Sequence, residues 1–516
     1  MKDMNAIELK GVTKRFGEVT ANDNINLTLK KGEILSILGE NGSGKTTLMN
    51  MLSGIYFPDD GKIYINGKEV TIRSPKDSFA LGIGMIHQHF KLIDVLTAAE
   101  NIILGLQGSQ RLNMPQIISE IKELTSKYGF ELDPEQKIYD MSVSQKQTVE
   151  IVKVLYRGAD ILILDEPTAV LTPQETEKLF AVLRNMKKAG KSIIIITHKL
   201  NEVLELSDRV AVLRKGKYIG TVQTSTATVE SLTEMMVGEK VSLNINRTQP
   251  KEPQKRIEVH DLTIKNREGL NVVNNVSFTA NSGEILGIAG IAGSGQKELL
   301  EAIAGLEQSE NGQVLYHSPE GITSDITNRK SEEISKMNIK LSFVPEDRLG
   351  MGLVGSMDIT DNMMMRSYKN KGHFFVDRKT PRELARKIVD KLEVVTPGVN
   401  TPVGRLSGGN VQKILVGREI SSNPDVLMVA YPVRGLDINS SYTIYNLLNQ
   451  QKEKGVAVIC VIEDLDVLLE LCDRILVISS GKVTGIVDAR TATKDQLGLL
   501  MTGHTEDDRR EKAVNE

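Results

Sequence analysis

The chain has 516 residues, a length that predicts at least two domains at roughly 100–200 residues each. Charged residues make up 25% of the chain, and 64 Lys and Arg against 67 Asp and Glu give a formal net charge of -3. This balance provides no general attraction to nucleic acid or to anionic lipid. Cys460 and Cys472 are the only cysteines, too few for a four-cysteine zinc site or a disulfide framework, and they favour a reducing compartment.

The sequence contains no segment that predicts insertion into a membrane. Its N-terminus, MKDMNAIELKG, has no apolar core of the kind that a secretion signal carries. No apolar run approaches the ~18 residues that a membrane-spanning helix needs. We therefore expect any attachment to a membrane to come through a partner protein.

The chain repeats itself. IELKGV at 7–12 matches IEVHDL at 257–262, and LSDRVAVLRKGK at 206–217 matches LCDRILVISSGK at 471–482. The matched segments keep their order, and the second copy carries about fourteen extra residues in its middle. The repeat predicts two domains of one fold, at residues 1–243 and 257–503. An exposed linker at 244–256 joins them, and a charged tail at 504–516 follows.

Within each copy, short apolar runs alternate with longer helical patterns. In the first copy the runs include EILSILG at 33–39, ILILDEP at 161–167 and SIIIITH at 192–198. Buried parallel strands joined by helices explain this alternation, which predicts an α/β fold. Residues 97–159 differ, because they open with the capping-box pattern TAAE and continue with few strand candidates. We interpret them as a helical subdomain inserted into the domain.

The first functional motif is GENGSGKT at 39–46, between a strand candidate and a helix candidate. Its glycines let backbone N–H groups converge on phosphate oxygens, Lys45 neutralises phosphate charge, and the Thr46 hydroxyl is a ligand for Mg²⁺. A purely structural turn does not need Lys-Thr at this spacing. The motif therefore predicts a phosphate-binding loop.

Two further strands end in groups that suit phosphate chemistry. Asp165 and Glu166 end one strand, where two carboxylates can divide the binding of Mg²⁺ and the polarisation of a water. His198 ends the next. Each alone has an ordinary structural explanation, a strand-to-turn boundary or a structural histidine. Their order after a phosphate loop favours a catalytic role.

These motifs in this order resemble those of the ATP-binding-cassette (ABC) family, and the resemblance covers almost the whole chain in two copies. It implies two tandem P-loop NTPase domains, each with a mixed sheet core and an inserted helical subdomain. It also implies ATP and Mg²⁺ as cofactors. In the terms of this family, residues 39–46 are the Walker A loop, Gln88 is the Q-loop glutamine, Asp165 is the Walker B aspartate, Glu166 is the catalytic base and His198 is the switch histidine.

The resemblance assigns the site residues in three groups. It implies that Lys45, Gln88, Glu166 and His198 act in catalysis and that Thr46, Gln88 and Asp165 hold the metal. It implies that ATP contacts Gly39, Asn41, Gly42, Ser43, Gly44, Lys45, Thr46 and Thr47. Phe16 falls where the family stacks an aromatic ring on adenine, although a phenylalanine of the core explains this residue equally well.

The second copy has lost most of these residues. Gln296 stands in place of Lys45 and Lys297 in place of Thr46, in the loop GIAGSGQK at 290–297. Matching of the other motifs places Ala430 opposite Asp165, Tyr431 opposite Glu166, Glu346 opposite Gln88 and Glu463 opposite His198. No general base remains in this copy.

The family's signature motif shows the opposite pattern. The second copy carries LSGGN at 406–410 and the D-loop GLD at 435–437, where the first copy has MSVSQ at 141–145 and VLT at 170–172. In this family two cassettes enclose ATP head to tail. The resemblance therefore implies one consensus site, which combines the first copy's Walker residues with Ser407, Gly408, Gly409 and Asp437, and one degenerate site.

The resemblance also implies a role in transport. The chain resembles the ATPase subunit of an uptake system, at the cytoplasmic face of the membrane, docked on two transmembrane permease subunits that an extracellular substrate-binding protein supplies. It implies no nucleic-acid partner and no direct contact with the transported molecule. Tandem ATPases of this length resemble importers of nucleosides or of monosaccharides such as ribose and galactose. Two kinds of feature favour nucleosides. The second copy has lost its Walker B motif, and the chain resembles the nucleoside group in three segments, GMIHQHF at 84–90, HFFVDR at 373–378 and TPGVNTPVGRLSGGN at 396–410.

A soluble tandem-cassette factor that acts on ribosomes or DNA is the alternative from another class. Such ribosomal factors resemble this chain less, because they carry a long charged helical linker and keep catalytic residues in both halves. The related repair ATPases carry zinc-binding cysteines, which this sequence lacks.

Overall fold

A computed structural model of the chain divides into two units, Met1–Ser242 and Leu243–Glu516. It describes residues 4–88, 90–106, 113–239, 245, 247–250, 252–367 and 377–503. The predicted tail at 504–516 and most of the HFFVDR motif at 373–378 lie outside these residues.

The first unit consists of ten strands and eight α-helices among its described residues. Its strands are β1 (Asn5–Phe16), β2 (Val19–Lys30), β3 (Ile34–Leu38), β4 (Asp60–Ile65), β5 (Lys68–Val70), β6 (Ile83–Ile86), β7 (Ile161–Asp165), β8 (Ser192–Thr197), β9 (Arg209–Arg214) and β10 (Lys217–Gln223). Its helices are α1 (Lys45–Leu52), α2 (Pro75–Ala80), α3 (Ala98–Ile103), α4 (Met114–Tyr128), α5 (Val143–Tyr156), α6 (Pro173–Lys188), α7 (Leu200–Leu206) and α8 (Val229–Val237).

The second unit repeats this order. Its strands are β11 (Lys255–Lys265), β12 (Asn271–Asn281), β13 (Ile285–Ala289), β14 (Asn311–His317), β15 (Thr323–Asp325), β16 (Leu341–Val344), β17 (Val426–Ala430), β18 (Ala457–Val461), β19 (Arg474–Ser479) and β20 (Lys482–Asp488). Its helices are α9 (Gln296–Ile303), α10 (Ser331–Lys336), α11 (Ile359–Met364), α12 (Lys379–Lys391), α13 (Gly408–Ser421), α14 (Ile438–Glu453), α15 (Leu465–Leu471) and α16 (Lys494–Met501).

Each unit combines parallel and antiparallel strands, as predicted. The first has the strand order β5-β4-β1-β2-β10-β9-β3-β8-β7-β6, in which β9, β3, β8, β7 and β6 are parallel. The second repeats the parallel part as β16-β17-β18-β13-β19. Every residue of β3, β7 and β8 is buried, which explains why the sequence shows mostly apolar runs there without polar alternation.

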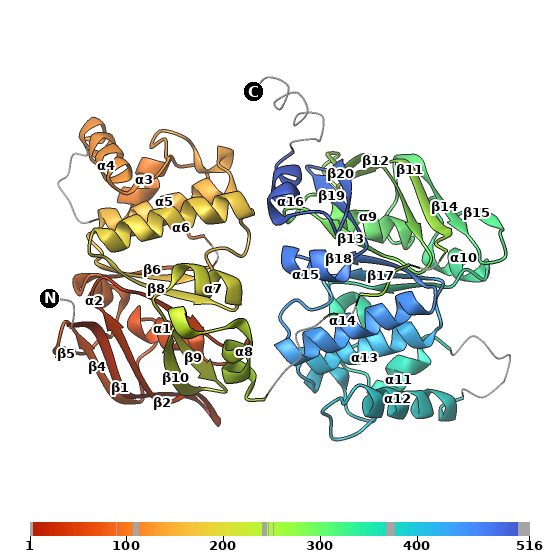
Figure 1. The fold of residues 1–516 in the computed structure, drawn as a ribbon, viewed down its shortest axis with the longest axis horizontal. Helices are drawn as coiled ribbons and strands as arrows, with labels where there is room; N and C mark the ends of the chain where they lie inside the picture. Colours follow the sequence, from red (N-terminus) through yellow and green to blue (C-terminus); the bar gives the residue numbers. More distant parts are fainter. Residues whose placement is uncertain are drawn as a thin grey trace. The chain divides into compact units, whose positions relative to one another are not determined.

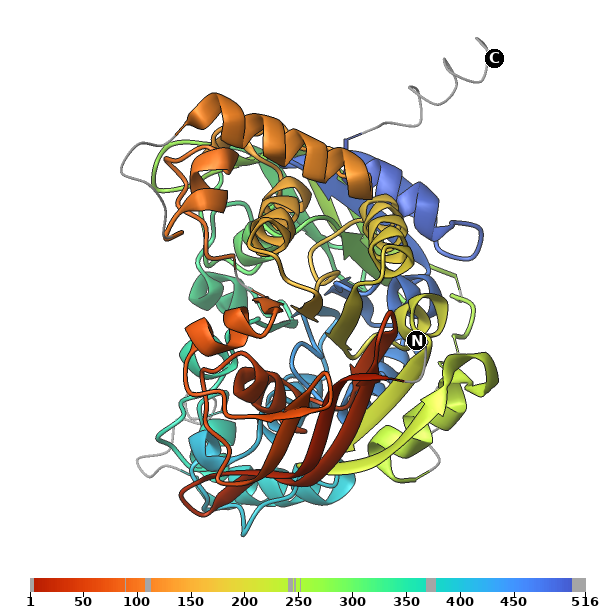
Figure 2. The same ribbon diagram turned by 90° about the vertical axis from the view of Figure 1, so that its left-hand side faces the viewer.

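The helical subdomain predicted at 97–159 is present. Thr97 and Glu100 form the predicted capping box at the start of α3, in which each side chain bonds the other's backbone N–H. In Figures 1 and 2, α3 and α4 lie at the opposite end of the first unit from β1 and β2. Helices α11, α12 and α13 occupy the corresponding place in the second unit.

Among its described residues, the predicted linker over 244–256 is exposed or half-buried except at Arg256, which is buried. Strand β11 begins at Lys255, and part of the segment before it is fastened to the second unit. The Arg247 guanidinium donates to the Leu469 carbonyl at 2.9 Å, and the Lys452 ammonium donates to the Thr248 carbonyl at 2.5 Å. Its polar composition did not reveal these bonds, because each uses a backbone carbonyl that any residue type provides.

Candidate functional site

The parallel sheet of the first unit gathers the predicted catalytic residues at one edge. The Gly-rich loop follows β3, Asp165 ends β7, His198 follows β8, and Gln88 follows β6 two residues after the strand ends. Because β3, β8, β7 and β6 are consecutive parallel neighbours, their carboxyl ends meet at this edge.

The Gly-rich loop has a backbone that requires glycine. Gly42 and Gly44 have φ angles of 79° and 95°, in the left-handed region. A Cβ at Gly39 would lie 2.3 Å from the Leu213 carbonyl oxygen, and one at Gly44 would lie 2.3 Å from the Ala21 oxygen. Asn41 is exposed within the loop, and Thr46 and Thr47 lie in the first turn of α1.

Two polar side chains of this loop fit a bound phosphate. The Lys45 ammonium donates to the carbonyls of Gly39 at 2.6 Å and Glu40 at 2.9 Å, and its burial lowers its pKa. The buried Ser43 hydroxyl has no hydrogen-bond partner within the described residues. Phosphate oxygens would supply an acceptor to this hydroxyl and negative charge to Lys45. The loop thus fits the triphosphate of ATP.

Thr46 and Asp165 lie together at the end of the loop. The Thr46 hydroxyl is 3.4 Å from Asp165 Oδ2, and Asp165 is 8% exposed. Burial, together with the charge of Glu166, raises the pKa of Asp165 to about 6. A divalent cation would relieve both effects, and a hydroxyl and a carboxylate are ligands that Mg²⁺ accepts. These two residues therefore fit the predicted metal.

Glu166 is held by the two residues that were predicted to act with it. Gln88 Nε2 donates to Glu166 Oε2 at 2.9 Å, and His198 Nδ1 lies 2.9 Å from Glu166 Oε1. The bond with His198 lowers the pKa of Glu166, which keeps the carboxylate ionised. Glu166 has a φ of 47°, rare for a residue with a side chain, and its N–H donates to the Ile196 carbonyl at 2.9 Å. In this arrangement Gln88 contacts Glu166, and no hydrogen bond joins it to Thr46 or Asp165 within the described residues.

Phe16 is a surface residue, which rules out the alternative of a core position. Its side chain is 43% exposed at the end of β1. The edge of one ring meets the face of the other in its contact with Tyr56, at 5.1 Å between centroids, and the Lys14 ammonium lies 5.5 Å from its centroid. An exposed ring supported from the side can present a face to a planar ligand.

The second unit keeps the loop but not its charge. Gly293 and Gly295 have φ angles of 85° and 101°, like their first-unit counterparts. Gln296 Nε2 donates to the Ile291 carbonyl at 3.1 Å, the position that matches one of the Lys45 bonds. The Lys297 ammonium is directed to Glu301 at 3.8 Å, along its own helix. Gln296 therefore preserves the shape of the loop without providing a cation for phosphate.

The residues that replace Gln88, Glu166 and His198 gather around an arginine. Arg434 pairs with Glu346 and also with Glu463, the latter at 3.5 Å from its Nε. Its guanidinium lies 5.7 Å from the ring centroid of Tyr431. Tyr431 keeps the unusual backbone of Glu166, with a φ of 49°. The arrangement of charge thus differs: a carboxylate lies between an amide and an imidazole in the first unit, and a guanidinium lies between two carboxylates in the second.

The two signature segments differ in how their helices begin. Ser142 caps α5, because its hydroxyl accepts from the N–H of Gln145 at 3.2 Å and Gln145 returns the bond. The Ser407 hydroxyl makes no capping bond to α13 and instead accepts from the Asn410 amide at 2.9 Å. The capping box satisfies two backbone N–H groups at the start of α5, whereas α13 begins without a side-chain cap.

The other predicted signature residues lie around the start of α13. Ser407 and Gly408 are exposed, and Gly409 is buried. A Cβ at Gly409 would lie 2.9 Å from the Ser440 hydroxyl and 3.2 Å from Asp437. Asp437 caps α14 by accepting from the N–H of Ser440 at 2.7 Å. The D-loop therefore packs directly on the signature segment within this unit.

Comparison with known families identifies the chain. The model of the ABC transporter family matches residues 22–169 and again residues 273–432. The chain belongs to the ABC transporter family. Its two matched segments contain the phosphate loops and the signature segments of both units, so it is a tandem ABC protein of the kind that binds and hydrolyses ATP.

Three ABC relatives match nearly the whole chain. The nucleoside import ATP-binding protein NupA of Lactococcus lactis is 43% identical and covers 98% of this chain and 99% of its own length. The guanosine import ATP-binding protein NupO of Bacillus subtilis is 41% identical, with 97% and 98% covered. The ribose import ATP-binding protein RbsA 1 of Streptomyces avermitilis is 37% identical, with 96% and 93% covered.

Within the part of this ABC protein that the structure describes, no helix has both the length and the apolar character needed to cross a membrane.

The sequence analysis missed Arg434, which pairs with Glu346 and Glu463 in the second unit. The signal was present, because two glutamates at the positions of Gln88 and His198 call for a nearby cation.

Proposed function

We propose that this ABC ATPase is the subunit that powers the import of nucleosides through a membrane transporter. The observation that carries the proposal is the paired hold on Glu166, by Gln88 and His198, at the end of an intact phosphate loop. The names of NupA and NupO support nucleosides as the cargo.

Each first-unit residue of the proposed site has a role in binding ATP, in binding the metal or in hydrolysis. Gly39, Asn41, Gly42, Ser43, Gly44, Lys45, Thr46 and Thr47 bind the phosphates, and Phe16 stacks on adenine. Thr46, Asp165 and Gln88 belong to the metal site, where Mg²⁺ supplies charge that polarises the terminal phosphate. Lys45 adds a second positive charge. Glu166 accepts a hydrogen bond from the attacking water, while His198 and Gln88 each occupy one of its oxygens.

We further propose that the second unit completes this site with Ser407, Gly408, Gly409 and Asp437. Support comes from the complementary losses, since each copy lacks what the other keeps, and from the uncapped start of α13. The degenerate site, with Arg434 between two glutamates, hydrolyses no ATP.

The proposed setting is the cytoplasmic face of the cell membrane. There the chain docks on two permease subunits, and an extracellular binding protein delivers the substrate to them. The chain contacts neither nucleic acid nor the transported molecule. Import of ribose or a related sugar is the second candidate, supported by the relationship to the ribose import protein.

The cargo is tested by uptake of labelled nucleosides, ribose and galactose in cells that lack the gene. We expect loss of nucleoside uptake alone, restored by the wild-type gene but not by Glu166→Gln. Normal nucleoside uptake with failed ribose or galactose uptake would establish the second candidate. Co-purification with ribosomes instead of membrane subunits would point to the soluble factor.

The single hydrolytic site is tested by matched substitutions in the purified full-length chain. Removal of a base or of a phosphate-stabilising cation costs about 10²–10⁴ in rate, so Glu166→Gln and Lys45→Ala should nearly abolish hydrolysis. Tyr431→Phe and Gln296→Ala, at the matching positions of the second unit, should change it less than about twofold. Equal losses at both sites would refute the one-site proposal.

A further inference from the structure

A polar link joins the loop that carries Glu166 to the helix that follows His198. The Thr168 hydroxyl donates to the Glu202 carboxylate at 2.5 Å. The Lys199 ammonium bonds both partners, at 3.0 Å to Glu202 Oε1 and 3.0 Å to the Thr168 carbonyl. Thr168 lies two residues after Glu166, and Lys199 directly follows His198.

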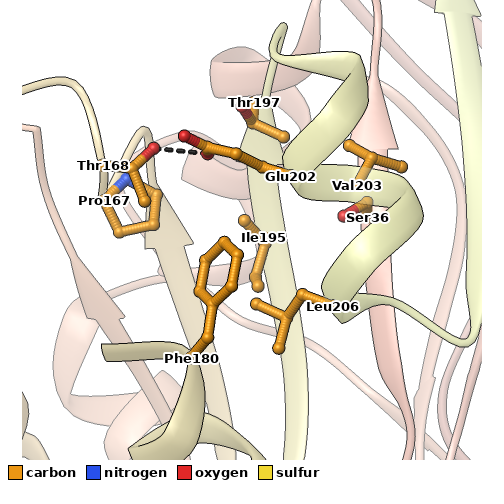
Figure 3. A pocket seen from close by; sticks show the side chains of 9 residues that line it. All are labelled: Ser36, Pro167, Thr168, Phe180, Ile195, Thr197, Glu202, Val203 and Leu206. Carbon is orange, nitrogen blue, oxygen red and sulfur yellow. Dashed lines mark hydrogen bonds between the residues drawn. The ribbon is translucent and has the colours of Figure 1, made fainter. Parts of the chain in front are cut away.

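The link is shielded from water on one side. Thr168 is 2% exposed, and Figure 3 shows its hydroxyl facing the Glu202 carboxylate above the side chains of Phe180, Ile195 and Leu206. A charge-assisted bond in such a partly apolar setting is stronger than one in water. Gln147 holds the same loop from α5, since its amide donates to the Pro167 carbonyl at 2.7 Å.

The second unit lacks these ties at every position. Val433 stands in place of Thr168, Val467 in place of Glu202, and Asp464 in place of Lys199. Both valines pack against the core of the second unit. Gln412, in place of Gln147, is buried, and neither atom of its amide group has a hydrogen-bond partner within the described residues. The unit with a base therefore has the link, and the unit without a base has an apolar contact in its place.

The link is not needed for the unusual backbone at the base position. Glu166 and Tyr431 have nearly the same φ, 47° and 49°, and each N–H bonds the neighbouring strand, at 2.9 Å to Ile196 and 3.0 Å to Val461. The positive φ at this position thus occurs with or without the link. The unit with the link differs in its side chains, because Glu166 Oε1 and His198 Nδ1 lie 2.9 Å apart there.

We infer that Thr168, Lys199 and Glu202 are positioning residues, which hold the Glu166 loop and the His198 loop in the register that hydrolysis requires. This inference rests on the proposed role of Glu166 as the base. It assigns no contact with ATP to the three residues, so it predicts an effect on turnover rather than on nucleotide binding.

The test compares kcat and KM for ATP hydrolysis by the full-length chain. Thr168→Val and Glu202→Val introduce the residues that the second unit tolerates at these positions. Each should lower kcat about 10- to 100-fold with KM within about twofold of wild type. The double variant should be no slower than the slower single variant, because both substitutions break the same link. Thr168→Ser, which keeps the hydroxyl, should restore at least half of the wild-type kcat.

Ser207→Ala is the matched control. Its hydroxyl lies 2.5 Å from the hydroxyl of Ser36, which lines the same pocket as Thr168 and Glu202. It should leave kcat within twofold of wild type. Full activity of Thr168→Val, or an equal kcat loss in Ser207→Ala, would overturn the inference. If Thr168→Val does not fold, Lys199→Met replaces it, because the Lys199 side chain is 34% exposed.

Glu166→Gln separates the two failures. If it abolishes hydrolysis while Thr168→Val does not slow it, only the positioning role is wrong. If Glu166→Gln itself retains hydrolysis, the proposed function of the site is wrong, and the inference falls with it.

Discussion

At the scale of single residues, the two units place different side chains at the same strained backbone position. Glu166 and Tyr431 have the same strained backbone, at φ angles of 47° and 49°. Gln88 and His198 contact the first, whereas Arg434 and two glutamates surround the second. The fold thus preserves the same strained position in both units, and the surrounding side chains differ between them.

The raised pKa of Asp165 predicts that this residue lowers the stability of the metal-free protein near neutral pH, although the proposed site uses it to hold the metal. The pKa rises from 3.8 in the unfolded chain to about 6 in the folded protein, so the folded state binds more protons between these values. In the absence of metal, the contribution of this group to the free energy of unfolding therefore falls as pH rises from about 4 to 6. It stays at its lowest above that range.

Asp165→Asn should remove this pH dependence. At pH 7.5 in EDTA, the variant should be more stable than wild type by about 1–3 kcal/mol, yet it should lose Mg²⁺-dependent hydrolysis. At pH 4 the two proteins should be alike. Urea unfolding at both pH values measures the difference, and an equal difference at both would show that Asp165 does not titrate as described.

At the scale of elements, the signature helices separate a structural cap from a functional one. Ser142→Ala removes the capping box of α5 and should cost about 1 kcal/mol of stability, with hydrolysis unchanged. Ser407→Ala removes no cap from α13 but should weaken hydrolysis, because the proposed site uses this hydroxyl.

Thermal unfolding and ATPase rates of the two variants test this contrast. The expected result is a lower Tm for Ser142→Ala alone and a lower kcat for Ser407→Ala alone. A kcat loss in Ser142→Ala equal to that in Ser407→Ala would assign both helix starts the same role.

Sequence patterns predicted these elements well where the signal is local. The TAAE pattern placed the start of α3, since a capping box involves residues three apart. The apolar runs placed β3, β7 and β8, since strands buried on both faces carry no polar alternation. The self-capping of α5 was not predicted, although Ser142 and Gln145 have the spacing of a capping box.

At the scale of the whole molecule, each unit has an ion pair at a matching position, and the two pairs are buried to different extents. In the first, Lys187 and Asp208 have side chains 34% and 38% exposed. In the second, the matching Lys452 and Asp473 are 1% and 7% exposed, because the segment around Thr248 and the side chain of Arg490 lie against them. The same residue pair is thus a surface contact in one unit and a buried pair in the other.

Matched substitutions should expose this difference. Lys452→Met leaves the Asp473 carboxylate buried without its nearest cation and should cost about 3 kcal/mol. Lys187→Met should cost less than about 1 kcal/mol. Urea unfolding of the full-length chain measures both, and a similar cost for the two would show that the linker segment does not bury Lys452 in solution.

The sequence by itself determined the repeat, the α/β class, the ABC family and the complementary losses of the two copies. These depend on residue identity at fixed local spacing, as in GENGSGKT or LSGGN, which remains visible without coordinates. Only the tertiary structure decided that Glu202 meets Thr168, that Arg434 lies between Glu346 and Glu463, and that Lys452 is buried. Each of these contacts joins residues far apart in the chain, so its geometry arises from strand order and helix packing rather than from any local pattern.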